Sequence, residues 1–301
     1  MPDLNDWVLT VGADELAFGF SETSDYPFKS QVSISEIARD VQDSPHPTAD
    51  ALLMGRDMLR GFTLQFESQI LREHPVTTKP WMSALDLYGA FAAAWRADAI
   101  RLTPGAYATL ANLERTRLVY GRPRGIAPKT EQLRKGYVNF QFDFDTISPD
   151  FYDTTEKVAT ITPVPASAGK LGSPLTTPIT TTTGTEDVAV TLNEGNLAAW
   201  PVVEFHGPAT ASSVELLAGV DRLWQIRVPD RIRFDEVVTV DTRPWRRSAT
   251  INGDPANGML RGNRLVDCKI PVGEFDIRYK VKDATGTAHT VIRWRDTYAS
   301  L

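Results

Sequence analysis

Two carboxylates one residue apart are the most suggestive chemical groups in the sequence. Asp143 and Asp145 lie within the alternating stretch 137–146, so both side chains would share one face of an extended strand. Such a pair suits a metal ion or a diphosphate sugar. The calcium-loop pattern fails, because Ile147 and Ser148 stand where a third oxygen ligand and a glycine are needed. We therefore interpret the pair as part of a solvated or partner-facing strand.

Other residues with catalytic or metal-binding chemistry are scattered. Glu204 and Asp241 are candidate carboxylates of a β-sandwich glycosidase, but their sequence spacing selects no pair. The four histidines are His46, His74, His206 and His289. No two of them are spaced as ligands on one helix or hairpin, so we interpret each as a surface or packed residue. Ser167 and Lys170 match S-x-x-K within a stretch rich in Pro and Thr, where no closed pocket is expected.

The nucleotide-binding, nucleophile-elbow and zinc-protease motifs are absent from the sequence. Their absence disfavours an enzyme without excluding one, and we predict no cofactor and no catalytic, cofactor-binding or metal-binding residues. Arg243, Arg246 and Arg247 surround Trp245 in a cluster that either meets a partner carboxylate or is a solvated loop. Four of the seven tryptophans would be stacking platforms in a sugar-binding sandwich and core residues otherwise: Trp200, Trp224, Trp245 and Trp294.

Composition excludes several classes of protein. The 301 residues contain 32 basic and 38 acidic side chains, a net charge of −6, which disfavours nucleic acid as a partner. The start of the chain is acidic and no apolar run approaches 18 residues, so we expect neither Sec export nor a membrane partner. Cys268 is the single cysteine, which excludes an intrachain disulfide. It alternates with Val266 and Ile270 and is predicted to be an inert thiol buried in a strand.

The first half of the chain reads as strands with one helix. Leu85, Tyr88, Phe91, Ala92 and Trp95 recur at spacings of three and four, which predicts a single long helix over 83–98. Ser83 and Asp86 supply its start signal, and Pro104–Gly105 lies beyond its end. In the strand predicted over 137–146, one face carries Val138, Phe140, Phe142 and Phe144 and the wet face carries Asn139, Gln141, Asp143 and Asp145. Further strands are predicted at 6–11, 30–35 and 62–70.

The second half predicts an antiparallel sandwich, because eight or nine short strands follow one another without crossover helices. These strands are expected at 188–192, 200–206, 213–217, 222–228, 237–240, 248–251, 265–270, 275–281 and 288–294. Asn252–Gly253 is typical of a type I′ hairpin turn. Because 159–186 is rich in Pro and Thr, we predict a linker there, between a domain over 1–158 and a domain over 187–301.

Several stretches, in this order, resemble the distal tail proteins of phages with long noncontractile tails, especially minor tail proteins of actinobacteriophages. In the first half they are Pro47–Asp50, Gly55–Asp57, Arg60–Thr63, Ala94–Arg96, Arg101–Gly105, Val119–Arg124 and Gly136–Tyr152. In the second half they are Trp200–Pro201, Gly207–Pro208, Val240–Thr242, Asn252–Gly253, Pro271–Glu274 and Arg293–Asp296. Each pattern is weak alone, but together they span both predicted domains.

The resemblance implies a structural role, and on this basis we predict a noncatalytic protein. Distal tail proteins form a ring, usually a hexamer, at the end of the tail tube, on which tail-tip proteins assemble. It implies a mainly β fold: an N-terminal ring-forming β-sandwich with one long helix and an extended hairpin, and a C-terminal galectin-like or carbohydrate-module-like sandwich. The expected partners are copies of the chain itself, the tail tube protein, the tape measure protein, and tail-tip or fibre proteins or a tail-associated lysin. The expected location is the virion tail tip, after assembly in the host cytoplasm.

Two alternatives remain at the level of sequence. One is a module that binds host cell-wall carbohydrate through exposed tryptophans, and the other is a β-sandwich glycosidase. The chain lacks the inserted carbohydrate-binding module of enlarged distal tail proteins, which leaves sugar binding open. In the ring hypothesis, the wet face of 137–146 and the charged segment 55–60 are candidate polar contacts.

Overall fold

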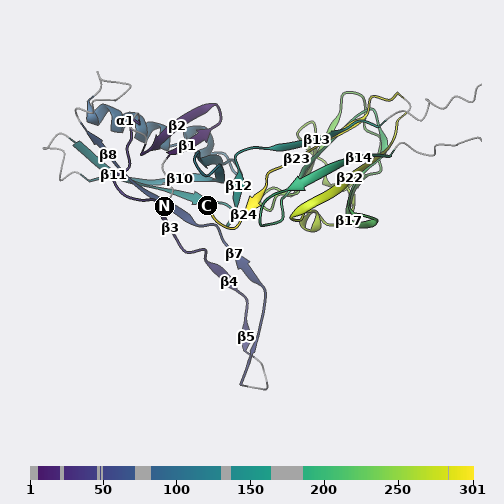
Figure 1. The fold of residues 1–301 in the computed structure, drawn as a ribbon, viewed down its shortest axis with the longest axis horizontal. Coiled ribbons are helices and arrows are strands. Elements are labelled where there is room, and N and C mark those ends of the chain that lie inside the picture. The colour runs from purple at the N-terminus through teal and green to yellow at the C-terminus, as the bar shows by residue number, and fades with distance from the viewer. Residues whose placement is uncertain are drawn as a thin grey trace, which may run out of the picture. The chain divides into compact units, whose positions relative to one another are not determined.

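The computed structural model of the chain describes residues 6–20, 24–45, 48, 50–71, 83–129, 137–163, 186–283 and 285–301. The chain forms two compact units, Met1–Thr154 with Tyr298–Leu301, and Thr155–Thr297. Both are built mainly from antiparallel strands, as the sequence predicts (Figure 1). No helix within the described ranges is long and apolar enough to span a membrane.

The first unit consists of one antiparallel sheet, two helices and a projecting ribbon. Its elements are β1 (Asp6–Val11), β2 (Asp14–Gly19), β3 (Ser33–Ile34), β4 (Arg39–Val41), β5 (Ser44–Pro45), β6 (Leu52–Leu53), β7 (Asp57–Leu59), β8 (Thr63–Leu71), α1 (Ala84–Trp95), α2 (Asp98–Arg101), β9 (Ala108–Asn112), β10 (Arg117–Lys129), β11 (Tyr137–Thr146) and β12 (Phe151–Asp153). The main sheet has the order β2-β1-β9-β10-β11-β8-β3, and β12 pairs with β10 and with β24 (Thr297–Tyr298).

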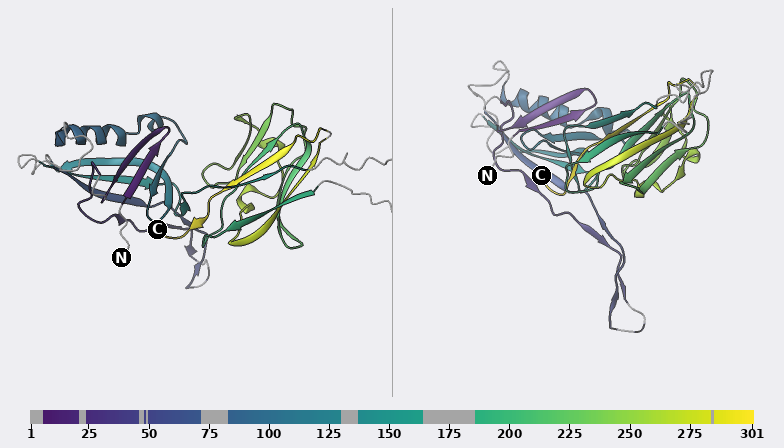
Figure 2. Two further views of the ribbon diagram at one scale, coloured as in Figure 1. Left: turned by 45° about the horizontal axis from the view of Figure 1, so that its top comes forward. Right: turned by 45° about the vertical axis from the view of Figure 1, so that its right-hand side comes forward.

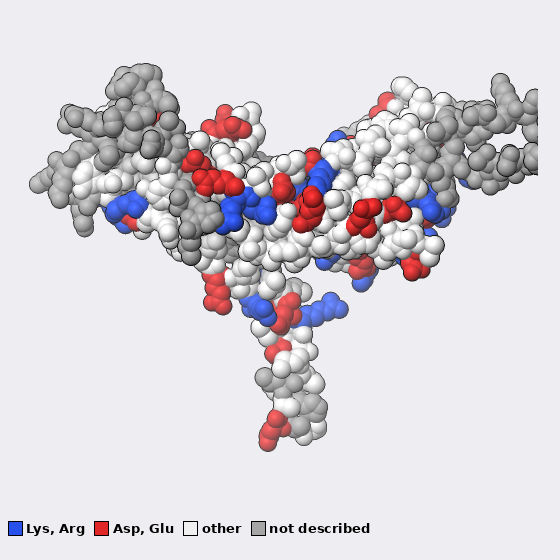
Figure 3. Space-filling view, in the orientation of Figure 1, with Lys and Arg blue, Asp and Glu red and all other residues white. Residues whose placement is uncertain are grey.

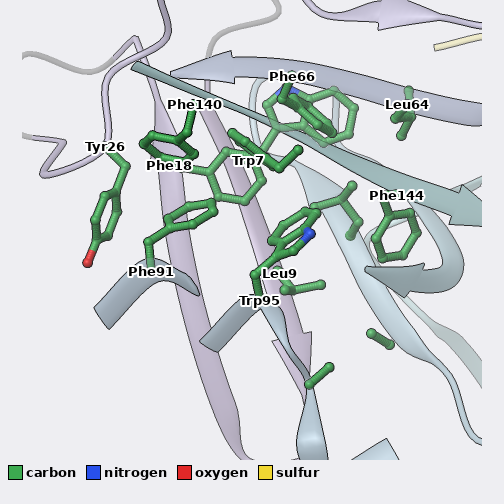
Figure 4. Packing of buried hydrophobic residues seen from close by; sticks show 14 of the residues in the cluster. Trp7, Leu9, Phe18, Tyr26, Leu64, Phe66, Phe91, Trp95, Phe140 and Phe144 are labelled. Carbon is green, nitrogen blue, oxygen red and sulfur yellow. The ribbon is translucent and has the colours of Figure 1, made fainter. Parts of the chain in front are cut away.

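The main sheet folds over its own apolar face. Trp7 on β1 and Phe66 on β8 are separated by three strands in the sheet order, yet their ring centroids lie 5.4 Å apart. Phe18 on β2 likewise lies 5.2 Å from Phe142 on β11. Both contacts are edge-on, the geometry that aromatic pairs favour. The two ends of the sheet therefore sandwich an aromatic core, which is seen from close by in Figure 4.

Helix α1 closes this core along one side. Its start is the capping box expected from the sequence, in which Asp86 N donates to Ser83 Oγ at 3.2 Å and Ser83 N donates to Asp86 Oδ2 at 3.3 Å. Phe91 and Trp95 are buried as predicted. The prediction for Leu85 was wrong: it is 59% exposed, because the helix turns Ala84 and Leu87 toward the sheet instead.

Strand β11 has the bounds and the apolar face that the alternation predicts. Val138, Phe140, Phe142 and Phe144 are all buried, and Gln141 and Asp143 lie on the outer face. Asn139 was wrongly assigned to the wet face, since it is only 1% exposed. It lies in the middle of the sheet, between Gln69 on β8 and Lys129 on β10, and alternation along one strand does not reveal that its side chain is covered.

The second unit is an antiparallel sandwich of two sheets. Its elements are β13 (Lys157–Ile161), β14 (Glu186–Asn193), β15 (Val202–His206), β16 (Thr210–Ala218), β17 (Asp221–Val228), β18 (Val237–Asp241), β19 (Ser248–Ile251), β20 (Asp254–Pro255), η3 (Asn257–Met259), β21 (Arg261–Gly262), η4 (Leu265–Asp267), β22 (Gly273–Lys282) and β23 (His289–Trp294). One sheet runs β13-β23-β15-β18-β19-β20 and the other β14-β22-β16-β17-β21. The predicted Asn252–Gly253 turn is confirmed by positive φ at both residues, 48° and 95°.

The strand predicted over 265–270 was wrong. Residues Leu265–Asp267 form the short 3-10 helix η4, and Cys268 follows it with its Sγ 3.4 Å from the carbonyl oxygen of Arg264. The apolar residues of this segment are buried because the loop that carries them packs on the sandwich core. Cys268 itself is fully buried, as expected, and burial raises the pKa of its thiol to about 12.

The linker predicted over 159–186 does not separate the two units. Its first residues belong to β13, which pairs with β23 inside the second unit, and its last residue begins β14 of the same unit. Residues 164–185 lie outside the described part of the chain. The Pro/Thr-rich stretch therefore connects two strands of the second unit, whose first residue is Thr155.

Candidate functional site

The most distinctive surface of the first unit is a projecting ribbon, residues 33–60, which we call the arm. Its two sides pair as β4 with β7 and, farther out, as β5 with β6. It leaves the main sheet beside β8, where Ser33 and Ile34 pair with Gln65 and Leu64. Figure 1 and the right-hand view of Figure 2 show the arm extending away from that sheet.

Ion pairs and one close backbone approach hold the arm together. Arg60 binds Asp40 with two hydrogen bonds, at 2.7 and 2.5 Å, and Arg39 lies 4.0 Å from Asp57 on the opposite side. Gly55 N donates to Asp43 Oδ1 at 2.8 Å. A Cβ on Gly55 would lie 1.9 Å from the Gln42 carbonyl oxygen, so only glycine fits. The charged segment 55–60 named from the sequence is therefore one side of this ribbon.

The arm has no core of its own. None of its described residues is buried, and several large apolar side chains are exposed, including Met54 at 80%. The other exposed apolar residues of the arm are Ile34, Val41, Leu53, Met58 and Leu59. An isolated two-stranded ribbon is at best marginally stable in water, and exposed apolar groups mark interaction sites. Figure 3 shows acidic and basic side chains mixed along the arm near the sheet.

Sequence pattern alone did not identify the arm. Its strands are two or three residues long, too short for a period-2 signal, and the extended hairpin came only from the resemblance. The order of the charges gives no signal either. The register places Arg39 opposite Leu59 and Val41 opposite Asp57, so the ion pairs Arg39–Asp57 and Asp40–Arg60 cross the ribbon diagonally.

The outer face of the main sheet carries a polar hollow of about 360 Å³, which we call the sheet hollow. Its walls include the amides of Gln31, Gln65 and Gln141 and the carboxylates of Glu67 and Asp143. A bulge in β10, where the register with β11 shifts between Pro123 and Ile126, opens one side of it. The wet face predicted for 137–146 thus contributes Gln141 and Asp143 to one cavity.

The acidic groups of this face differ in their surroundings. Lys129 and Lys29 bind Glu67 at 2.8 and 3.1 Å, and the hydrogen bond from Lys129 is the main reason that the pKa of Glu67 is lowered. Asp145 accepts hydrogen bonds from Thr63 at 2.7 Å and Arg124 at 3.0 Å.

Asp143 differs from these two neighbours. Within the part of the chain that the structure describes, no cation or hydrogen-bond donor is recorded against its carboxylate, and burial followed by repulsion from Asp145 raises its pKa. A Cβ on Gly125 would lie 3.1 Å from Asp143 Oδ2, so the bulge glycine leaves this carboxylate accessible from the hollow.

The two carboxylates considered for glycoside hydrolysis are engaged by arginines. Arg243 binds both oxygens of Asp241, and Arg293 and His206 contact Glu204. They lie on adjacent strands, with Asp241 opposite Val202 and Glu204 opposite Thr239. Each carboxylate already has a strong partner, and Asp241 is buried, so the arrangement is that of structural ion pairs.

The structure brings two histidines together that the sequence left apart. His206 on β15 and His289 on β23 are opposite each other in the register, and their rings stack with centroids 4.2 Å apart. Only pairing between distant strands creates this contact, so spacing could not reveal it. No group of three or more potential metal ligands occurs among the described residues. His46, His74, Ser167 and Lys170 lie outside those residues.

The aromatic and basic candidates of the second unit are mostly packed. Trp200, Trp224 and Trp294 are buried, and Trp245 is half-buried, so these side chains do not form an exposed sugar platform. The predicted Arg/Trp cluster is present, but two of its arginines already contact other residues of the same unit. Arg243 is bound to Asp241, and the Arg247 guanidinium lies 5.7 Å from the centre of the Trp200 ring.

Comparison with known proteins gives a likeness in structure. No protein-family model and no curated protein matches the sequence. Among solved structures, the chain is similar to SPP1 Dit (gp 19.1), described as a paradigm of the hub adsorption apparatus in phages that infect Gram-positive hosts. The two share 11% identity with a TM-score of 0.55, over 97% of this chain and 98% of that chain.

The chain is also similar to a chain of the phage P2 baseplate in its activated conformation with Ca. The identity is 10% and the TM-score 0.50, over 96% of this chain and 97% of that chain. Both likenesses extend over the two units, so neither depends on one sandwich alone. At a sequence identity of 10–11%, these likenesses show a shared fold. The chain therefore has, from end to end, the two-part fold seen in phage hub and baseplate proteins.

Proposed function

We propose that the protein is a distal tail protein of a phage with a long noncontractile tail, of the minor tail protein group found in actinobacteriophages. In this role it forms a ring, a hexamer, that joins the tail tube to the tail-tip proteins. Its partners are then copies of itself, the tail tube and tape measure proteins, and tail-tip or fibre proteins or a tail-associated lysin. It acts at the virion tail tip after assembly in the host cytoplasm.

The observation that carries this proposal is the likeness to SPP1 Dit over nearly the whole of both chains. The arm supplies a physical reason for self-association. It exposes six large apolar side chains, has no buried residue among those described, and needs a partner to become stable. A ring needs two different patches on each copy, and the arm is one such patch.

The protein is proposed to act without catalysis, by holding other proteins. The carboxylates suited to a glycosidase are occupied by arginines, which gives no support to that alternative. Recognition of cell-wall sugar is the other alternative. Its main candidates, Trp200, Trp224 and Trp294, are buried, so it needs sugar contacts other than stacking on these rings.

Light scattering of the purified full chain tests the proposal. Six copies of 33.3 kDa give roughly 200 kDa. The double variant Met54→Ser/Met58→Ser removes apolar contact area from the arm, and we expect its mass to fall toward that of one chain. Leu102→Ser is the matched control, because Leu102 is 77% exposed on the same unit but outside the arm. Its mass should equal that of the wild type.

Two results would contradict the proposal. One is a wild-type mass of 33.3 kDa at every soluble concentration together with absence of the protein from purified virions. The other is release of reducing sugar from host cell wall that stops on substitution of Glu204 or Asp241.

A further inference from the structure

The sheet hollow contains an acidic group that lacks a counterion, and the arm contains a basic group that lacks one. Asp143 is half-buried in the hollow, with no cation bound to it among the described residues. Other acids of the first unit without a recorded partner, such as Glu36 and Glu114, are exposed and hydrated. A partly desolvated carboxylate gains more from a cation than an exposed one does, because water screens it less.

The hollow is suited to a planar, multiply donating cation. Its walls offer amide oxygens from Gln31, Gln65 and Gln141 around the Asp143 carboxylate. An arginine side chain carries five N–H donors and forms paired hydrogen bonds with a carboxylate. The volume of about 360 Å³ leaves room for such a side chain with its aliphatic part.

Most cations of the first unit already have partners. Lys29 and Lys129 hold Glu67, and Arg124 holds Asp145. Arg39 and Arg60 are paired within the arm. Among the described residues of this unit, Arg56 and Arg115 are exposed and have no recorded side-chain partner. Of these two, only Arg56 lies in the arm, between β6 and β7.

Arg56 cannot fill the hollow of its own chain. It stands five residues before Gly61, which already packs against Thr146 of β11, and at about 3.3 Å per residue of strand this places it about 16 Å out along the arm. The arm also extends away from the sheet that carries the hollow (Figures 1 and 2). Any contact between the two must therefore join different copies of the chain.

We propose that Arg56 on the arm of one copy inserts into the sheet hollow of a second copy and pairs with Asp143 there. The exposed Met54 and Met58 flank Arg56 on the arm and would pack around the rim of the hollow. The contact is heterologous, with an arm on one copy and a hollow on the next, which is the type of contact that closes a ring. The proposal rests on the self-assembly proposed above and identifies the residues that carry it.

Charge reversal in the full chain tests the contact. Arg56→Asp and Asp143→Arg should each weaken assembly at least tenfold in concentration, since each places like charges together. The double variant Arg56→Asp/Asp143→Arg restores opposite charges and should recover most of the wild-type assembly. Arg115→Asp is the control, because it reverses the other unpartnered cation and should leave assembly unchanged. Circular dichroism verifies that each variant is folded.

Cross-linking gives a second, direct measurement. Variants Arg56→Cys and Asp143→Cys are mixed and treated with a short bismaleimide. The native Cys268 is fully buried with a raised pKa, so it does not compete. We expect covalent dimers in the mixture and none with either variant alone, since one copy must supply the arm and another the hollow.

The outcomes separate this inference from the proposed function. If the wild type assembles but all single reversals assemble equally well, or the mixture gives no covalent dimer, this contact is wrong and the ring stands. If the wild type never assembles, the ring fails and this contact fails with it. Assembly lost in both single variants without recovery in the double variant also rejects the Arg56–Asp143 pairing.

Discussion

Single polar side chains hold several turns of this fold, and Asp283 shows how much one carboxylate can organise. It follows β22 and accepts hydrogen bonds from the backbone N–H groups of Thr285, Thr287 and Ala288 at 2.7 to 2.9 Å. Burial by itself raises the pKa of Asp283, but the hydrogen bonds from Ala288 and Thr285 outweigh it and the pKa is lowered. The ionised form therefore stabilises the turn.

Replacement of the Asp283 carboxylate should lower the free energy of unfolding more at neutral pH than in acid. We expect Asp283→Ala to lower the free energy of unfolding by about 2–3 kcal/mol at pH 7. Because the folded-state pKa lies below the usual 3.8, this stabilisation is complete above that value and is lost as the pH falls through the folded pKa. Urea unfolding at pH 7 and pH 3 measures the difference in unfolding free energy between the wild type and Asp283→Ala. An equal difference at both pH values would contradict the explanation. Exposed Asp221→Ala is the control.

Gly55 is the residue on which the arm depends most directly. We expect Gly55→Ala to distort the ribbon, because its Cβ would lie 1.9 Å from the Gln42 carbonyl oxygen. Trypsin should then cut several-fold faster at Arg39, Arg56 or Arg60, while the thermal midpoint stays unchanged because no described arm residue is buried. Gly89→Ala on α1 meets no atom within 4 Å and should leave the tryptic pattern as it is. Identical digestion of all three proteins would show that the arm tolerates the added methyl.

At the scale of elements, α1 is the best example of local sequence deciding local structure. Its first turn is held by the Ser83–Asp86 capping box, and its buried face packs on the aromatic core. Removal of the cap by Ser83→Ala should cost about 1 kcal/mol, since the N–H of Asp86 loses its acceptor. Thermal unfolding measures the loss, and Leu85→Ala on the exposed face should change stability by less than half as much. An unchanged midpoint for Ser83→Ala would contradict this role.

At the scale of the whole molecule, the two units have separate hydrophobic cores. One cluster contains Phe91 and the other contains Ile277, and no residue belongs to both. We therefore expect two unfolding transitions in calorimetry. Phe91→Ala should destabilise only one transition, by about 3–5 kcal/mol, and Ile277→Ala only the other, by about 2–5 kcal/mol. A single transition shifted by both variants would mean that the units unfold together.

Patterns of short range predicted much of this protein. The bounds of β11, the start of α1, the Asn252–Gly253 turn and most strands of the second unit follow from periodicity and turn chemistry. The reason is physical. Side-chain direction repeats every 2 residues in a strand and every 3.6 in a helix, so residues close together in the sequence determine which face is apolar. The single cysteine likewise excludes an intrachain disulfide without any structure.

Which residues cover each face of a strand depends on segments far away along the chain, and sequence periodicity did not predict these contacts. Asn139 is buried although the alternation places it on the wet face, and His206 meets His289 only because β15 pairs with β23. Gln31, Gln65, Gln141 and Asp143 form one hollow only after β8, β11 and the bulged β10 come together. The arm stands free of its sheet because its strands pair with each other. These contacts join distant residues, whose approach is set by the packing of the whole unit rather than by the local spacing of side chains.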